Sequence, residues 1–368
     1  MDGDFPHPER SAPRAALAAI APYQPGMSVA GARSRHPGRG FAKLSSNENP
    51  HGPSPKALAA AAAALASAAT YPDSRSASLK RALAAHLSAD PAKIVVGPGS
   101  EALIDYFFRA YLGEGDVLLL SRPTFPSYEI FARSAGAAIL DVPRRTDFSL
   151  DVEGVIAALA SAPKALALCS PNNPTGNRTP RADLARIIAA TPLSTVILMD
   201  EAYAEFHGEA SALALLQSWG GVFLLTRTFS KAYGLAGLRI GYGLTSDPEV
   251  GEAFDRLRPA FNLTSASQAA AEAALADSGH LKAGVAAVIA ERERLQVGLA
   301  AAGIAYVPSE ANFVFVRAPV ALEATFEALL VAGVIARPIP FGEGWLRISV
   351  GLPQANDAVV AALAALAR

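Results

Sequence analysis

The 368-residue sequence is poor in cysteine, in lysine and in net charge. Its single cysteine, Cys169, excludes an intramolecular disulfide and is typical of a reducing, cytoplasmic compartment. The 32 basic and 33 acidic side chains leave a formal charge of −1. Because no basic excess is present to neutralise phosphates, the balance argues against a nucleic-acid partner.

Long apolar runs and metal-binding patterns are also missing. No stretch of 18 strongly apolar residues is present, and the first ten residues do not form a cationic lead into an apolar segment. We therefore expect neither a membrane partner nor a secretory signal. The six histidines are scattered without an H-E-x-x-H pattern or cysteine neighbours, so we expect no metal site.

Apolar runs and helix-like stretches alternate along much of the chain. The six strands expected in this part are residues 94–96, 117–121, 165–170, 196–200, 222–227 and 239–244. The helices expected between most of them are residues 100–112, 126–135, 152–160 and 181–190. Continuous apolar strands joined by helices indicate an α/β fold with a mostly parallel sheet between helices. Ligands of such sheets bind at the carboxyl ends of the strands.

The two ends of the chain differ from its middle in composition and in the order of the predicted helices and strands. Residues 1–45 are rich in Pro, Gly and Arg and predict an N-terminal arm, with a short helix at 17–20, that joins the small domain. Ser54 and Pro55 predict a helix start, and the Ala-rich run continues that helix to about Ala69. A long helical region to Ala302 precedes strands at 312–317, 334–337 and 345–350 and helices at 321–332 and 355–368. We expect a large domain at 46–255 and a small α+β domain at 256–368.

A lysine lies just after the expected strand at 222–227. Lys231 stands among small and apolar residues, where burial would lower its pKa and free its amine as a nucleophile. Thr228, Ser230 and Arg239 flank it, and two hydroxyls with a guanidinium suit a dianionic phosphate. A lone lysine is most often a solvated surface group, but that interpretation leaves these three neighbours unexplained.

Three other loops that follow expected strands hold groups able to bind a ligand. Asn173 lies in a Pro-Asn-Asn-Pro-Thr-Gly turn, which can aim its amide into a crevice. Asp200 ends a buried strand, and such an acid requires hydrogen bonds or a cation, for example a protonated pyridine nitrogen. The Gly-rich turn before Ser100 places backbone N–H groups at a helix N-terminus, where anions bind. Each loop alone has a plainer interpretation, as a turn, a core ion pair or a helix cap.

Two residues near these loops remain open between a functional and a structural role. Phe125, which follows the strand at 117–121, could stack on a flat ring, although an aromatic side chain there more often packs in the core. Cys169 lies inside an apolar strand, which favours a buried structural thiol over a nucleophile.

Taken together and in this order, the four loops resemble those of the aspartate-aminotransferase fold family of pyridoxal-5′-phosphate (PLP) enzymes. The resemblance is closest to the histidinol-phosphate aminotransferase group. It extends from Tyr23-Gln24-Pro25-Gly26 and Asn47-Glu48-Asn49-Pro50 to the run Trp345-Leu346-Arg347-Ile348-Ser349-Val350-Gly351. It implies the fold type I of PLP-dependent transferases, PLP as the cofactor, and a transaminase that exchanges an amino group between a donor and a 2-oxo acid.

The resemblance also implies a role for each matching residue. Lys231 is expected to hold PLP as a Schiff base and then to move a proton, with Asp200 on the pyridinium nitrogen. The other residues expected to bind the cofactor are Asn173 and Tyr203 at the ring oxygen, Phe125 on the ring face, and Thr228, Ser230, Arg239 and the backbone of Gly99, Ser100 and Glu101 at the phosphate. Tyr71 is expected to reach the PLP phosphate of a neighbouring subunit, which implies a homodimer.

The substrate is less sharply defined by the resemblance. Arg347 is expected to bind the α-carboxylate of glutamate or 2-oxoglutarate, and Arg337 and Tyr23 to bind the distal phosphate of histidinol phosphate. The run from Pro338 to Trp345 also resembles aromatic amino-acid aminotransferases, which makes phenylalanine and tyrosine the alternative substrates. A threonine-phosphate decarboxylase and a non-catalytic regulator share the fold and remain further alternatives.

Overall fold

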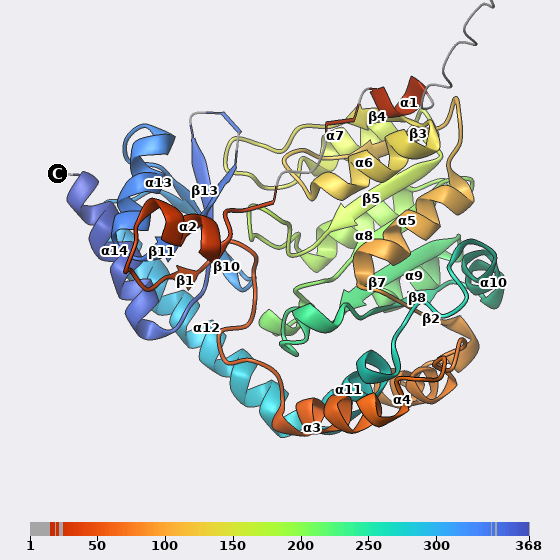
Figure 1. Ribbon diagram of the computed structural model, residues 1–368. Helices are drawn as coiled ribbons and strands as arrows, with labels where there is room; N and C mark the ends of the chain where they lie inside the picture. Colours follow the sequence, from red (N-terminus) through yellow and green to blue (C-terminus); the bar gives the residue numbers. More distant parts are fainter. Residues whose placement is uncertain (1–14, 19, 22–24, 340, 343, 368) are drawn as a thin grey trace, which may run out of the picture.

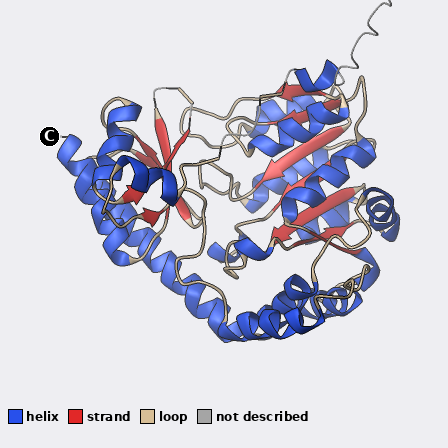
Figure 2. Cartoon of the chain, viewed as in Figure 1, coloured by secondary structure: helices blue, strands red, loops and turns tan. Residues whose placement is uncertain are grey.

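The computed structural model describes residues 15–18, 20–21, 25–339, 341–342 and 344–367 of the chain. Its strands gather in two separate groups, each covered by helices (Figure 1, Figure 2). The larger group is a seven-stranded sheet in the order β2-β8-β7-β6-β5-β3-β4, and the smaller is a four-stranded sheet in the order β12-β13-β10-β9. The expected α/β fold, with a large sheet domain and a smaller α+β domain, is confirmed.

The large sheet is parallel except at one strand. Its strands are β2 (Ile94–Gly97), β3 (Val117–Leu120), β4 (Ala138–Asp141), β5 (Ala165–Cys169), β6 (Val196–Asp200), β7 (Phe223–Thr228) and β8 (Gly241–Thr245). Only β8 runs antiparallel to its neighbours β2 and β7, and the other pairs of the sheet are parallel. The carboxyl ends of β5, β6 and β7 therefore meet at one edge.

Helices cover both faces of this sheet because its strands are apolar on both sides. Along β6, Ile197 and Met199 enter one hydrophobic cluster, whereas Val196 and Leu198 enter the cluster on the opposite face. The second cluster is closed by α5 (Ser100–Tyr111), α6 (Pro126–Ala135) and α10 (Pro248–Leu257). The first is closed by α3 (Pro55–Ala64), α4 (Ala77–Leu87), α7 (Val152–Leu159), α8 (Arg181–Ala190), α9 (Leu213–Trp219) and α11 (Ser265–Ala276).

The small sheet is antiparallel and is joined to a short parallel pair. Its strands are β9 (Tyr306–Val307), β10 (Phe313–Arg317), β12 (Arg337–Ile339) and β13 (Trp345–Ser349). The parallel pair is formed by β1 (Ala42–Lys43) and β11 (Val334–Ile335). The helices around them are α2 (Val29–Arg35), α12 (Ser278–Ala301), α13 (Leu322–Val331) and α14 (Pro353–Leu366).

Several predicted boundaries differ from the structure. The strand predicted at 239–244 begins only at Gly241, because Arg239 has a φ of +50° and ends a short 3₁₀ helix at Ala236–Leu238. The strand predicted at 334–337 is two strands, β11 and β12, which belong to different sheets. Sequence analysis missed β4, β9 and β12, which are short or only partly buried.

The helical predictions were coarser than the structure. The long region before Ala302 is divided into α10, α11 and α12. The Ala-rich helix α3 ends at Ala64 and passes into a 3₁₀ turn at Leu65–Ser67, and the short N-terminal helix α1 is Ala15–Ala18. Two further 3₁₀ turns are Pro91–Lys93 and Ala204–Phe206.

The domain boundaries at 45 and 255 stay a prediction, and α11 packs against α3 and α4 of the large sheet's helical layer. In the part of the chain that the structure describes, no helix is both long and apolar enough to cross a membrane.

Candidate active site

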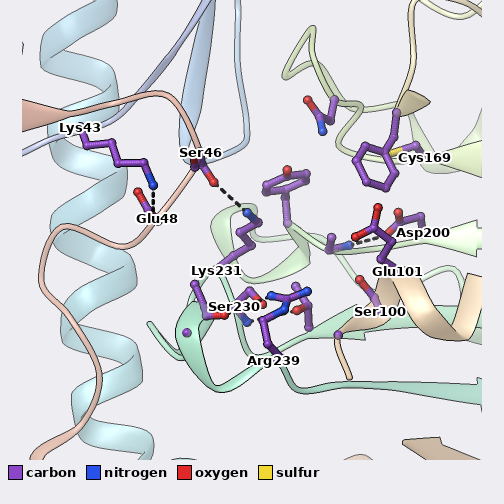
Figure 3. Close-up of a pocket in the computed structure, with 18 residues that line it drawn as sticks. Lys43, Ser46, Glu48, Ser100, Glu101, Cys169, Asp200, Ser230, Lys231 and Arg239 are labelled. Carbon is purple, nitrogen blue, oxygen red and sulfur yellow. Dashed lines mark hydrogen bonds and ion pairs between the residues drawn. The ribbon is translucent and has the colours of Figure 1, made fainter. Parts of the chain in front are cut away.

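A cavity of about 390 Å³ lies beside the carboxyl ends of the central strands of the large sheet. We call it the Lys231 cavity. In Figure 3, Lys231 and Asp200 extend from separate walls toward the same space, with Ser230 and Arg239 beneath it. The predicted residues that line it are Gly99, Ser100, Glu101, Phe125, Asn173, Asp200, Tyr203, Thr228, Ser230, Lys231 and Arg239.

The strand topology explains why these residues converge. Asp200 is the last residue of β6, Lys231 follows β7 by three residues, and Asn173 follows β5 in the turn that the sequence predicted. Because β5, β6 and β7 are parallel neighbours, the loops after them open on the same edge. Ser100 begins α5 directly after β2, which is also parallel to β7 through the intervening β8.

The Lys231 side chain is half-buried, and its amine has a backbone acceptor. Its Nζ donates a hydrogen bond to the carbonyl oxygen of Ser46 at 3.1 Å and lies 5.9 Å from the centroid of the Tyr203 ring. Burial, and secondarily the charge of Arg347, lowers the pKa of Lys231 to about 7. A substantial fraction of this amine is therefore unprotonated, and nucleophilic, at neutral pH.

Asp200 is a buried acid with a defined orientation. The Tyr128 hydroxyl donates to Asp200 Oδ2 at 2.6 Å, and the backbone N–H of Ala202 donates to Oδ1 at 3.0 Å. Burial raises the pKa of Asp200, while these two hydrogen bonds oppose the rise. The arrangement favours a cationic partner in the cavity, since such a partner would offset the cost of burying the carboxylate.

The floor of the cavity is a cradle for an anion. Gly99 has a φ of +87°, and a Cβ there would lie 2.6 Å from an Nη atom of Arg239. A Cβ on Gly241 would lie 2.3 Å from the backbone nitrogen of Ser100. Both glycines thus let the N-terminus of α5 and the Arg239 guanidinium approach the same point, where a phosphate finds donors and positive charge. The Glu101 carboxylate accepts a hydrogen bond from Ser127 at 2.6 Å, so its backbone N–H remains the group for the ligand.

Tyr203 and Asn173 are each fixed by one neighbour. Asn47 donates through Nδ2 to the Tyr203 hydroxyl oxygen at 3.0 Å, which leaves the Tyr203 proton to be donated elsewhere. Arg347 donates through Nη1 to Asn173 Oδ1 at 2.7 Å. The Cys169 thiol, which also lines the cavity, is buried, and burial raises its pKa to about 12. It is therefore a neutral structural thiol at physiological pH, as the sequence favoured.

A second cavity, of about 570 Å³, adjoins the first and shares Phe125 and Asn173 with it. We call it the Arg337 cavity. Arg337 on β12 and Arg347 on β13 are direct cross-strand partners, so their side chains lie on the same face of the small sheet. Two like charges placed side by side destabilise a sheet, and anionic ligands remove that cost. Its other lining residues come mostly from the large domain, between Leu120 and Pro174.

Comparison with known proteins gives one family. Residues 39–363 match the family model described as aminotransferase class I and II. The chain belongs to the class I and II aminotransferases. Among its relatives, histidinol-phosphate aminotransferase 2 of Caulobacter vibrioides is 53% identical over 352 residues, which cover 96% of this chain and 93% of that protein. The aromatic amino acid aminotransferase of Rhodococcus jostii is 38% identical, with 95% of this chain and 94% of that protein covered.

A solved structure supports the same assignment. The crystal structure of histidinol-phosphate aminotransferase from Sinorhizobium meliloti in complex with pyridoxal-5′-phosphate superposes with a TM-score of 0.88. The two chains are 30% identical, and the match covers 97% of this aminotransferase and 98% of the other. The similarity therefore includes both sheets.

One predicted cofactor-binding residue that the structure describes, Tyr71, does not line the Lys231 cavity. Tyr71 is 80% exposed and stacks on Phe261 with ring centroids 4.4 Å apart. Tyr23 lies outside the described residues. Sequence analysis also missed Tyr128, which holds Asp200, since a tyrosine in the first turns of α6 carries no signal of its own.

The segment 44–49, which the sequence predicts as a loop and which carries part of the resemblance, connects both sheets. Leu44 hydrogen-bonds through its backbone to Ile335 and Ser349 of the small domain, at 2.9 and 2.8 Å. The carbonyl oxygens of Ser45 and Ser46 accept from Arg347 at 2.7 Å and from Lys231 at 3.1 Å. The Asn-Glu-Asn-Pro pattern was the available signal for this segment.

Proposed function

We propose that this aminotransferase is a histidinol-phosphate:2-oxoglutarate aminotransferase, which uses PLP to transfer the amino group of glutamate to imidazole-acetol phosphate and so forms histidinol phosphate, a step of histidine biosynthesis. The observation that carries the proposal is one cavity holding a half-buried lysine, a buried aspartate and an anion cradle, joined to a second cavity with paired arginines. The similarity to histidinol-phosphate aminotransferases over nearly the whole chain supports the substrate.

The residues of the Lys231 cavity fit PLP group by group. The cradle of Gly99, Ser100 and Arg239 suits its dianionic phosphate, and Asp200 suits its protonated ring nitrogen. Phe125 supplies a flat apolar surface for the ring. Thr228 and Ser230 add hydroxyls at the phosphate end, where the Thr228 Oγ1 accepts from the backbone N–H of Ser230 at 3.1 Å.

The reaction needs one group that can both hold the cofactor and move a proton. When bound, PLP withdraws electrons from the bonds of the substrate's Cα atom. Lys231 would hold the cofactor covalently through Nζ, and the same amine, when free, would take the substrate's Cα proton as a general base. An amine with a pKa near neutrality is suited to this transfer. Tyr203 and Asn173 would donate hydrogen bonds to the ring oxygen, and Asp200 would hold the ring nitrogen.

The Arg337 cavity supplies the contacts that distinguish substrates. Arg347 binds the α-carboxylate of glutamate or 2-oxoglutarate, for which its planar fork of donors is suited. Arg337 binds the distal phosphate of histidinol phosphate, together with Tyr23. Phe125, Ile339 and Phe341 form apolar parts of the same cavity, which favour a flat ring in the substrate. Those apolar walls also support the second candidate, an aromatic amino-acid aminotransferase.

Steady-state kinetics of the holoenzyme decide between the two substrates. We expect kcat/KM for histidinol phosphate to exceed that for phenylalanine and tyrosine, with 2-oxoglutarate as the common amino acceptor. Arg337→Ala should lower kcat/KM for histidinol phosphate by about 10- to 100-fold and leave glutamate nearly unchanged. A wild-type preference for phenylalanine would reject the histidinol-phosphate assignment.

We also propose that the enzyme is a cytoplasmic homodimer in which Tyr71 reaches the partner's cofactor phosphate. Tyr71, Leu65 and Phe261 are 80%, 63% and 45% exposed, and together with neighbouring residues they line an apolar hollow of about 400 Å³. Burial of these side chains by a second copy would remove apolar surface from water. Analytical ultracentrifugation tests the dimer. Tyr71→Phe should weaken PLP binding several-fold, by loss of one hydrogen bond to a charged group, while a monomer with unchanged PLP affinity would contradict the proposal.

A further inference from the structure

Arg144 is a cation in the wall of the Arg337 cavity that no acidic group compensates. It lies three residues after β4, in the large domain, and shares the cavity with Arg337 and Arg347 of the small domain. Its Nη1 donates to the carbonyl oxygen of Phe148 at 3.1 Å, and its Nε is buried without a hydrogen-bond partner. Among the described residues, no carboxylate forms an ion pair with it.

A second arginine of the same cavity wall, Arg122, has its positive charge compensated by acidic side chains. Arg122 donates through Nε to Asp141 at 3.1 Å and through Nη1 to Glu129 at 3.4 Å. Both acids of the cavity are thus engaged by Arg122, and Glu129 also pairs with Arg133 at 2.8 Å. Arg144 is left as the surplus positive charge that the large domain contributes to the cavity.

The loop that carries Arg144 is fixed at both ends. The Arg144 backbone N–H donates to Arg122 O at 3.0 Å. Phe148 packs edge-on against Trp345 and Phe315 of the small domain, with ring centroids 4.9 and 5.4 Å apart. The carbonyl of Phe148, which receives the Arg144 hydrogen bond, also accepts from Asn177 Nδ2 at 2.9 Å. The guanidinium is therefore preorganised and need not be ordered when a ligand arrives.

The charge and burial of the Arg144 guanidinium suit a group that binds an anion. Burial lowers its pKa to about 10, which leaves it protonated at neutral pH. A buried cation without a counter-charge is unfavourable for stability, and an anionic ligand offsets the cost of its desolvation.

We propose that Arg144 is a specificity-determining residue that binds the anionic group of the substrate other than an α-carboxylate. The inference rests on the proposed function, because it assigns Arg144 to the substrate cavity of that enzyme. The shared ligand chemistry is a compact oxyanion, supplied either by the phosphate ester of histidinol phosphate or by the side-chain carboxylate of glutamate. Arg144 would complete, from the large domain, a site whose other cations come from the small domain.

The test compares kcat/KM of the holoenzyme for histidinol phosphate, histidinol, glutamate and phenylalanine. Arg144→Gln should lower kcat/KM for histidinol phosphate by about 10- to 100-fold, with histidinol and phenylalanine changed less than about threefold. Arg144→Lys, which keeps the charge but not the fork, should restore part of the loss. Arg122→Gln, in the same wall but already ion-paired, is the matched control and should leave the ratio of histidinol phosphate to histidinol unchanged.

The glutamate measurement separates the two sources of the anion. A loss for glutamate as well as histidinol phosphate supports a subsite that serves both substrates, and a loss for histidinol phosphate alone supports a phosphate subsite. A parallel fall for all four substrates, or no change in any, overturns the proposal. If wild-type enzyme does not prefer histidinol phosphate to histidinol, the proposed substrate fails, and the ratio of glutamate to phenylalanine still tests Arg144.

Discussion

The two cavities are built in different ways, although they share Phe125 and Asn173. Most of the Lys231 cavity comes from loops at one edge of one sheet, and its reactive groups have close partners, such as Tyr128 for Asp200 and Ser46 for Lys231. The Arg337 cavity lies between two domains and combines apolar walls with arginines from both. Under the proposed function, the difference separates chemistry from selectivity: the first cavity would activate any amino substrate, and the second would determine which substrate binds.

Removal of the Lys231 amine should have the largest effect and should not distinguish substrates. We expect Lys231→Ala to lower kcat by at least about 10⁴-fold for every amino donor, because the general base and the covalent anchor are lost together. Pre-steady-state kinetics measure this, with circular dichroism to check the fold. Substantial turnover with any donor would contradict the role of Lys231 and the proposed division between the cavities.

Arg347→Gln should have a smaller and selective effect. We expect kcat/KM for glutamate to fall by about 100-fold, since a bidentate, charge-assisted contact to the α-carboxylate is lost. Histidinol phosphate, which has no α-carboxylate, should lose much less. Steady-state kinetics with both donors give the ratio, and the absorbance of bound PLP serves as the control for the Lys231 cavity. Equal losses for both donors would mean that Arg347 acts through Asn173 and not on the substrate.

The pH dependence of the rate at which the apoenzyme incorporates PLP should reveal the pKa of the Lys231 amine. The pKa of this amine is lowered to about 7, and only its unprotonated form attacks the aldehyde. The rate of PLP incorporation into the apoenzyme should therefore rise about tenfold from pH 6 to pH 8 and then level off. Stopped-flow absorbance follows the reaction. A rate that continues to rise toward pH 10 would show an ordinary, solvated lysine.

Cys169 should contribute least, although it lines the Lys231 cavity. Its thiol is neutral at physiological pH, because burial raises its pKa to about 12. We expect Cys169→Ala to change kcat less than about threefold and to cost about 1 kcal/mol of stability from the small void. Activity assays and urea denaturation measure the two quantities. A large loss of kcat with unchanged stability would give the thiol a chemical role.

The sequence predicted the Lys231 cavity more completely than the Arg337 cavity, for a physical reason. Lys231, Asp200 and Asn173 each follow a buried strand, and parallel strands bring the loops after them to one edge. Such positions can be read from local patterns. Arg144 and Tyr128 have no local pattern, because their roles depend on packing between segments far apart in the chain.

The small domain shows the same limit at the level of strands. Residues 334–337 are predicted as one strand, but the chain changes sheets within it, between Ile335 and Arg337. No periodicity marks that change, since it is imposed by pairing with β1 on one side and β13 on the other. The start of β8 was misplaced because Arg239 adopts a left-handed conformation that is uncommon for an arginine.

The segment 44–49 gives the two cavities a mechanical connection. Arg347 and Lys231 donate hydrogen bonds to the backbone carbonyl oxygens of consecutive residues, Ser45 and Ser46. The arginine belongs to the small domain and the lysine to the large domain. A carboxylate that draws the guanidinium away from its carbonyl also disturbs the neighbouring peptide, to which the amine is tethered. Under the proposed function, the binding of a carboxylate at Arg347 would therefore be transmitted to the Lys231 amine along two residues of backbone.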